Sequence, residues 1–174
     1  MKKIFIAILP LILLSCHPIP ASCATFTGAT CSVSFSPKGD ATDNLVAAIN
    51  GAKKSIHVMA YSFTSEPIAA ALSAAAERKV EVIVIADKSQ LTANSSKIDN
   101  VKVSGAEVYI DSKHAIAHNK VMIFDGTSFH TGSFNFTTAA ENSNAENSLI
   151  CKSKAGAAIY EENFKLHLSH STKY

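Results

Sequence analysis

The chain has 174 residues, of which 47% are hydrophobic and 17% are charged, and its formal net charge is +2 at pH 7. This length and this apolar content fit one compact domain with a substantial core. The weak positive charge comes without runs of lysine or arginine, which excludes an obligate basic nucleic-acid-binding tail but permits an anionic partner.

The N-terminal segment has the pattern of an export signal. Two lysines precede an apolar run over residues 4–14, which is short for a bilayer span. Small residues predict ordinary cleavage after Ala24, whereas a segment resembling a lipoprotein box predicts a lipidated Cys16. We expect an exported protein, periplasmic or secreted. Its signal covers residues 1–24, or residues 1–15 if the protein is attached to the membrane through Cys16.

The four cysteines are Cys16, Cys23, Cys31 and Cys151, and the absence of C-x-x-C spacing argues against a zinc site. In an oxidising compartment Cys31, just before the first expected strand, and Cys151, in the last one, could form a disulfide that closes a long loop. The alternative, that each is an unpaired small hydrophobic residue, stays open.

Amphipathic helical windows then alternate with short β-branched runs, which predicts an α/β fold. The polar residues 90–100 predict a surface loop or a short helix. The strand, helix, strand succession before them predicts a parallel β-α-β unit. The expected elements, in chain order, are a helix over residues 40–54, a strand over 55–63, a helix over 66–79, strands over 80–86 and 106–110, and a C-terminal helix over 153–170.

A histidine and a lysine share one face of a further expected strand. Side chains two residues apart in a strand point the same way, so His118 and Lys120 lie together. Asp125-Gly126 predicts a hairpin turn, and a two-residue loop there would add Ser133 and Asn135 to the same face.

Several expectations depend on that loop length. With a two-residue loop, His130 lies on the opposite face and is expected at the surface. His114, which lies before the strand, is also expected at the surface. A three-residue loop would instead bring Phe134 and Phe136 to the histidine–lysine face. Gly132 would leave room for the close approach of a ligand.

These polar residues suit attack on a phosphodiester. Lys120, with donors from Ser133 and Asn135, can stabilise the anionic oxygens of the transition state without a metal. A neutral His118 can attack phosphorus if a carboxylate on its second nitrogen fixes the tautomer and stabilises the charged adduct. Glu146 is the candidate for that carboxylate, and we expect neither a metal nor another cofactor.

The spacing resembles a known signature. His118, Lys120 and Asp125, followed by the sequence GSFN from Gly132, match the HxKxxxxD…GSxN pattern of the phospholipase D superfamily. The sequence MAYSFT, from Met59, is further similar to the small single-motif bacterial endonucleases of that superfamily, the Nuc type. The resemblance implies a phospholipase D-like fold, with a mixed β-sheet flanked by helices on both faces.

The resemblance also implies roles for individual residues. His118 would become transiently phosphorylated, Lys120 and Asn135 would hold the phosphate, and Glu146 would bond the histidine. Asp125 falls on the motif aspartate and is counted with the catalytic residues. From spacing alone, however, it is a hairpin-capping residue on the opposite face of the strand.

A single motif per chain implies a partner. The reaction needs a second group to protonate the departing oxygen, and His118 of a symmetry mate could supply it in a homodimer that shares one site at the two-fold axis. We therefore expect residues 30–174 to form the catalytic domain of an exported, metal-independent endonuclease of low sequence specificity, which cleaves DNA and possibly RNA. The alternatives are a phospholipase D acting on phosphatidyl headgroup esters and a catalytically idle nucleic-acid-binding module.

Overall fold

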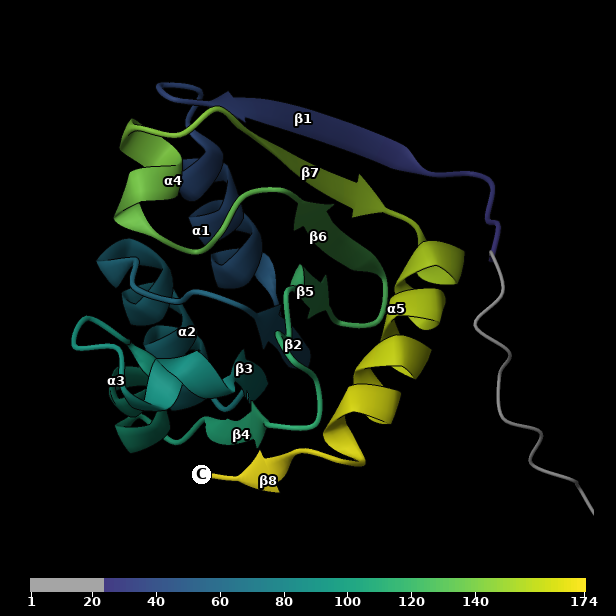
Figure 1. The fold of residues 1–174 in the computed structure, drawn as a ribbon. Helices are drawn as coiled ribbons and strands as arrows, with labels where there is room; N and C mark the ends of the chain where they lie inside the picture. The colour runs from purple at the N-terminus through teal and green to yellow at the C-terminus, as the bar shows by residue number, and fades with distance from the viewer. Residues whose placement is uncertain (1–23) are drawn as a thin grey trace, which may run out of the picture.

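The computed structural model describes residues 24–174 (Figure 1). The two signal alternatives, and with them Cys16 and Cys23, therefore lie outside the described residues or at their border. The described chain forms an eight-stranded sheet with the strand order β1-β7-β6-β5-β2-β3-β4-β8. Its elements are β1 (Thr30–Ser36), α1 (Ala41–Gly51), β2 (Ser55–Ala60), α2 (Glu66–Glu77), β3 (Glu81–Asp87), the 3-10 turn η1 (Lys88–Leu91), α3 (Ile98–Val103), β4 (Glu107–Asp111), β5 (Lys120–Phe124), β6 (Ser128–Gly132), α4 (Thr138–Asn142), β7 (Glu146–Lys152), α5 (Lys154–Leu168) and β8 (Thr172–Lys173).

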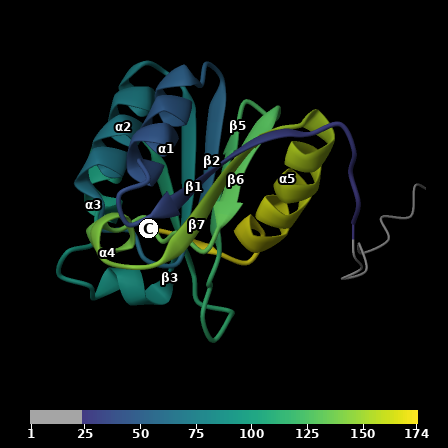
Figure 2. The same ribbon diagram turned by 90° about the horizontal axis from the view of Figure 1, so that it is seen from above.

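Helices cover both faces of this sheet, with α1, α2 and α3 on one face and α5 on the other (Figures 1 and 2). Side chains of alternate parity divide between two cores, as strand geometry requires. Val58 and Met122 belong to the core under α1 to α3, whereas Met59 and Ile123 belong to the core under α5. The expected α/β class and the mixed sheet flanked on both faces are confirmed.

The predicted parallel unit is also present, since β2 pairs with β3 in parallel and β3 with β4. Pro67 lies in the first turn of α2, where its missing N–H is not needed. The helix buries Ile68 and Leu72 against the sheet. β2 ends at Ala60, earlier than predicted. Beyond it the N–H of Tyr61 still bonds the residue before β5, whereas the N–H groups of Thr64 and Ser65 bond Phe136 beyond β6. None of the helices within residues 24–174 combines the length and apolarity that a membrane crossing requires.

The hairpin between β5 and β6 has a three-residue loop, so the prediction of a two-residue loop is wrong. Met122 pairs with His130 and Phe124 pairs with Ser128, which leaves residues 125–127 in the loop. Even-numbered positions therefore face even-numbered positions. In agreement with the alternative register, Phe134 and Phe136 are completely buried in the core under α1 to α3.

A disulfide joins Cys31 of β1 to Cys151 of β7, two residues that are direct partners in the antiparallel ladder. Cys151 is buried beneath α5, whereas β1 is an edge strand with most of its side chains exposed. The bond therefore attaches an exposed edge strand to the sheet across a separation of 120 residues.

Candidate active site

The ends of four neighbouring strands lie side by side at one end of the sheet and carry the residues predicted for the site. β2, β5, β6 and β7 pair antiparallel in turn. The C-terminal ends of β2 and β6 therefore adjoin the N-terminal ends of β5 and β7. We call this end of the sheet, which the four strand ends form, the site edge. Lys120 begins β5, and His118 lies two residues before it, outside the strand. Ser133 and Asn135 follow β6, and Glu146 begins β7.

The segment that follows β2 fixes these ends relative to one another. The N–H of Tyr61 donates to the carbonyl of Asn119 at 3.0 Å, just before β5. The N–H groups of Thr64 and Ser65 both donate to the carbonyl of Phe136 at 2.9 Å, beyond β6. One short stretch of backbone thus positions both the histidine–lysine segment and the segment that contains Asn135.

His118 is exposed beside a buried ammonium group. Its ring packs on Tyr61 with a centroid distance of 4.6 Å. The Nζ atom of Lys120 donates to the backbone carbonyl of His118 at 2.7 Å and lies 5.0 Å from the centre of the Tyr61 ring. Lys120 is only 7% exposed. A positive charge is therefore already in place next to an accessible imidazole and needs little reorganisation when an anion binds.

Glu146 contributes negative charge near this lysine. Burial lowers the pKa of Lys120, and the charge of Glu146 opposes that effect. The Glu146 carboxylate accepts a hydrogen bond from the side-chain amide of Asn144 at 3.1 Å. Within residues 24–174 it has no hydrogen bond to His118, so its predicted contact with the histidine stays a prediction.

Gly132 makes room for backbone and not for a ligand, which corrects the expectation from the sequence. Its φ is +148°, and a Cβ at this position would lie 2.2 Å from the carbonyl oxygen of Asn147. The N–H groups of Ser133 and Phe134 both donate to that same oxygen, at 3.1 and 3.3 Å. β6 therefore ends in a bulge against β7 that only glycine permits.

The bulge determines where the two polar residues of the signature lie. The Ser133 hydroxyl accepts from the N–H of Asn147 at 3.0 Å and keeps its own hydrogen available to donate. The Oδ1 atom of Asn135 is buried and has no partner within the described residues. In the same part of the chain, neither side chain is hydrogen-bonded to His118 or Lys120, so their contact with phosphate stays a prediction.

Asp125 lies at the opposite end of β5 from His118, and the whole strand Lys120–Phe124 separates them. Its carboxylate accepts hydrogen bonds of 2.7 to 3.1 Å from the backbone N–H groups of Lys53, Lys54 and Ser55. Burial alone would raise the pKa of Asp125, but these bonds lower it. The structure does not bring Asp125 to the site edge. The prediction that Asp125 is one of the catalytic residues is therefore corrected. Asp125 instead anchors the loop between α1 and β2.

His130 is completely buried, so the expectation that it lies at the surface is wrong. It pairs with Met122 and therefore shares the face of Lys120. Its Nε2 atom is 3.0 Å from the hydroxyl of Ser148, and its Nδ1 atom has no partner within the described residues. Burial lowers the pKa of His130 to about 4, so the ring is neutral at pH 7.

This histidine is expected to make the fold sensitive to mild acid. Histidine in an unfolded chain has a pKa of about 6.5, above the value of about 4 for buried His130. Between these values the unfolded chain binds a proton that the folded chain does not. The His130 contribution to the free energy of unfolding therefore decreases as pH falls, by at most about 1.4 kcal/mol per pH unit, and is constant above about pH 7.

Urea denaturation of the wild type and of His130→Gln, from about pH 7 to about pH 4, measures this contribution. The variant should lose less stability on acidification.

His57→Gln is a control of opposite sign. Burial alone would lower the pKa of His57, but hydrogen bonds to Glu161 and Glu81 raise it. His57 therefore stabilises the fold below about pH 6.5 and loses that effect at higher pH, so His57→Gln should lose more stability in acid than the wild type. Parallel curves for the wild type and His130→Gln would contradict the assignment.

His114 has partners that the sequence interpretation did not identify. It lies beside Asp111, His167 and His170 in a cluster at the end of β4. The only local signals in the sequence are the spacings D-x-x-H and H-x-x-H. These pairs lie far apart along the chain, and only the packing of α5 against the sheet brings them together.

Two hollows on the described chain are lined by residues other than His118. One, of about 280 Å³, is lined by residues at the starts of α1, α2 and α4, including Asp40 and Thr138. The other, of about 230 Å³, lies between β1 and β7 beside Cys31. Neither is lined by His118 or Lys120, so the His118 imidazole of one chain faces solvent and not either of these hollows.

Comparison with known proteins agrees with this geometry. The family described as "Cardiolipin synthase, PLD-like domain" matches residues 45–168. The crystal structure of Nuc from Salmonella typhimurium, a phospholipase D family member, has a TM-score of 0.81 and 36% identity, and the match covers 84% of this chain and 99% of that one. The chain therefore belongs to the phospholipase D superfamily. Within the superfamily it is a Nuc-type protein, as the signature predicted.

Relatives in other organisms carry other names. A "Phospholipase D" of Rickettsia bellii is 38% identical over 133 residues, which are 76% of this chain and 66% of the relative's length. The chain thus matches about two thirds of that relative. A "Mitochondrial cardiolipin hydrolase" of Xenopus laevis is 30% identical over 151 residues, 85% of this chain and 72% of the relative. Superfamily members such as Nuc and this hydrolase are phosphodiester hydrolases.

Proposed function

We propose that this protein is a metal-independent phosphodiesterase, an endonuclease of low sequence specificity that cleaves DNA through a phosphohistidine intermediate. The observation that carries the proposal is the exposed imidazole of His118, which packs on the same Tyr61 ring as the buried Lys120, whose ammonium group donates to the His118 carbonyl. Ser133, Asn135 and Glu146 lie at the same edge of the sheet. The 36% sequence identity to Nuc, over 99% of the Nuc chain, supports nucleic acid as the substrate class.

The proposed reaction has two displacements at phosphorus. A ring nitrogen of neutral His118 attacks phosphorus, the bond to the departing oxygen breaks, and a general acid gives that oxygen its proton. A water molecule then attacks the phosphohistidine, the phosphorus–nitrogen bond breaks, and the proton of the water passes to the group that acted as acid. Lys120 stabilises the non-bridging oxygens throughout, so no metal is needed for charge neutralisation.

The general acid is proposed to be His118 of a second copy. Within the chain the other candidates are placed for other tasks, since His130 is buried and neutral and His114 belongs to a separate cluster. Exposed apolar side chains support a partner at this edge. Ile116, two residues before His118, is 55% exposed, and Phe35, whose strand neighbour Ser36 pairs with Glu146, is 63% exposed. A homodimer would cover apolar surface and complete the site.

Mixed dimers test this sharing. Wild-type and His118→Ala chains with different affinity tags are coexpressed, and the mixed dimer is isolated through both tags. If one site needs both histidines, the mixed dimer should retain at most about a hundredth of the activity of a doubly tagged wild-type dimer, because it always lacks the nucleophile or the acid. Half of the wild-type activity would show that each chain works alone. A fully active monomer by light scattering would also contradict the shared site.

Resistance to chelation tests the chemistry and the substrate together. Wild type and His118→Ala are incubated in excess EDTA with plasmid DNA, with RNA and with phosphatidylcholine vesicles, at a temperature where circular dichroism shows that both stay folded. Only the wild type should cleave DNA, because Lys120 and not a metal carries the charge. Loss of cleavage in EDTA that magnesium restores would contradict the mechanism. Headgroup release without DNA cleavage would favour the phospholipase D alternative.

We further propose that the protein is exported, to the periplasm or beyond the cell. The disulfide between Cys31 and Cys151 supports this, since disulfides persist in oxidising compartments. The mass of the mature chain, measured on material isolated from its host, distinguishes cleavage after Ala24 from lipidation at Cys16. A mature chain that retains its first residues would contradict export by either route.

A further inference from the structure

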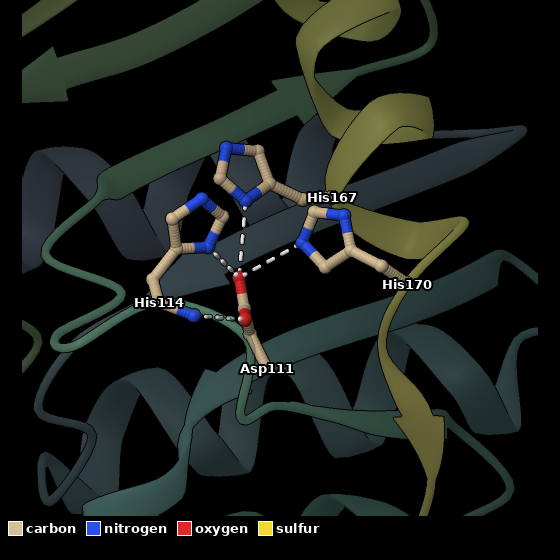
Figure 3. A group of neighbouring side chains, drawn as sticks. All are labelled: Asp111, His114, His167 and His170. Atoms are coloured by element: carbon tan, nitrogen blue, oxygen red, sulfur yellow. Dashed lines mark hydrogen bonds and ion pairs between the residues drawn. The ribbon is translucent and has the colours of Figure 1, made fainter.

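Three imidazoles converge on one carboxylate at the end of β4 (Figure 3). Asp111 ends the strand, His114 lies in the loop that follows, and His167 and His170 come from the end of α5 and the residues after it. The Oδ2 atom of Asp111 lies 2.8 Å from Nδ1 of His114, 3.1 Å from Nδ1 of His167 and 3.3 Å from Nε2 of His170. All four of these atoms lie within 4.8 Å of one another.

A hydrogen-bonded cluster explains this convergence poorly. A carboxylate oxygen offers two lone pairs, and here three ring nitrogens compete for one oxygen. Protonating the rings does not improve the arrangement, because the ring centroids lie only 5.0 to 5.4 Å apart and the added charges would repel. A cation among the four atoms removes the conflict, since each neutral imidazole and the carboxylate then direct a lone pair at the same centre.

We propose that Asp111, His114, His167 and His170 bind one Zn²⁺ ion in a tetrahedral site. Neutral imidazole and carboxylate are both established zinc ligands. With bonds of about 2.0 to 2.2 Å, neighbouring ligands of a tetrahedral ion lie about 3.4 Å apart, so even the widest pair here has to close by no more than about 1.5 Å.

The surroundings hold the carboxylate in place for such a role. Asp111 is completely buried. Its other oxygen, Oδ1, accepts from the backbone N–H groups of Lys113 at 3.0 Å and His114 at 3.3 Å, which leaves Oδ2 directed at the three rings. Outer hydrogen bonds of this kind orient metal ligands in proteins. His167 and His170 are also mostly buried, so binding needs little ordering of side chains.

The ion would connect parts of the chain that are distant in sequence. His114 belongs to the loop between β4 and β5, four residues before His118, whereas His167 and His170 belong to the C-terminal region. The same loop is held by the Lys88 ammonium, which donates to the His114 carbonyl at 3.0 Å. The proposed zinc therefore has a structural task, and His118 is not among its ligands.

Metal binding by the purified chain tests this proposal without reference to activity. The full-length protein, made without a histidine tag, is stripped with a chelator, dialysed and titrated with ZnCl₂ in a calorimeter. One Zn²⁺ should bind per chain, and at about 100 times Kd it should raise Tm by about 5–10 °C. Co²⁺ in its place should give the visible absorption of a tetrahedral complex.

Two variants and one control complete the test. The double variant His167→Gln/His170→Gln should lose at least about 100-fold in zinc affinity, and Asp111→Asn gives an independent variant if the first does not fold. His57→Gln removes a histidine beside α5 that already has its own carboxylate partners, and it should bind zinc as the wild type does. The proposal is overturned if the folded wild type takes up no stoichiometric zinc. Unchanged affinity in both site variants would overturn it equally.

Discussion

His118→Ala should lower the rate constant kcat for phosphodiester hydrolysis on the order of 10⁴-fold or more, because it removes the proposed nucleophile and its symmetry-related acid at once. The side chain is exposed, so its truncation should change Tm little. Binding of uncleaved DNA should persist, since Lys120 remains. Steady-state cleavage of a labelled oligonucleotide, together with a binding titration, measures both quantities.

Asn119→Ala is the matched control for this experiment. It alters the position between His118 and Lys120 and keeps the backbone carbonyl that bonds Tyr61. This variant should retain near wild-type turnover. If His118→Ala kept more than about a tenth of the wild-type kcat, a role for His118 as nucleophile would be excluded.

Lys120→Met should lower kcat/KM by about 10² to 10³-fold, because it removes a charge placed beside the reacting phosphate. Methionine resembles the apolar stem of lysine, so packing in the buried position should be kept. Lys113→Met removes an exposed lysine from the preceding loop and controls for the general attraction of DNA to positive charge. Equal losses in the two variants would show that Lys120 acts only through that general attraction.

The sequence predicts the arrangement of the sheet well where local periodicity determines it. The parallel unit of β2 and β3 follows from two apolar strands around an alanine-rich helix, and it is confirmed. The hairpin loop that contains Asp125 is one residue longer than predicted. The Asp125 carboxylate accepts from the backbone N–H groups of Lys53 and Lys54, in the loop before β2, and of Ser55, the first residue of β2. No pattern near Asp125 in the sequence reveals partners about 70 residues away.

In the candidate site, too, local sequence patterns predict some features, whereas contacts between distant segments determine others. His118 lies only two residues before Lys120, the first residue of β5, so their proximity could be predicted from the sequence. The bulge at Gly132 arises from the carbonyl of Asn147 on another strand and could not be predicted. The cluster around Asp111 was missed for a related reason, because its histidines come from two segments that meet only when α5 packs on the sheet.

Direct attack of His118 on phosphorus is the step on which the mechanism depends, and loss of activity in His118→Ala would also result if His118 only activated water. The stereochemistry at phosphorus separates the two cases. A single turnover of a phosphorothioate substrate of known configuration, cleaved in ¹⁸O-labelled water, gives a product whose configuration can be determined. Two in-line displacements through a phosphohistidine each invert phosphorus, so we expect net retention. Net inversion would show that water attacks phosphorus directly and would contradict the covalent role of His118.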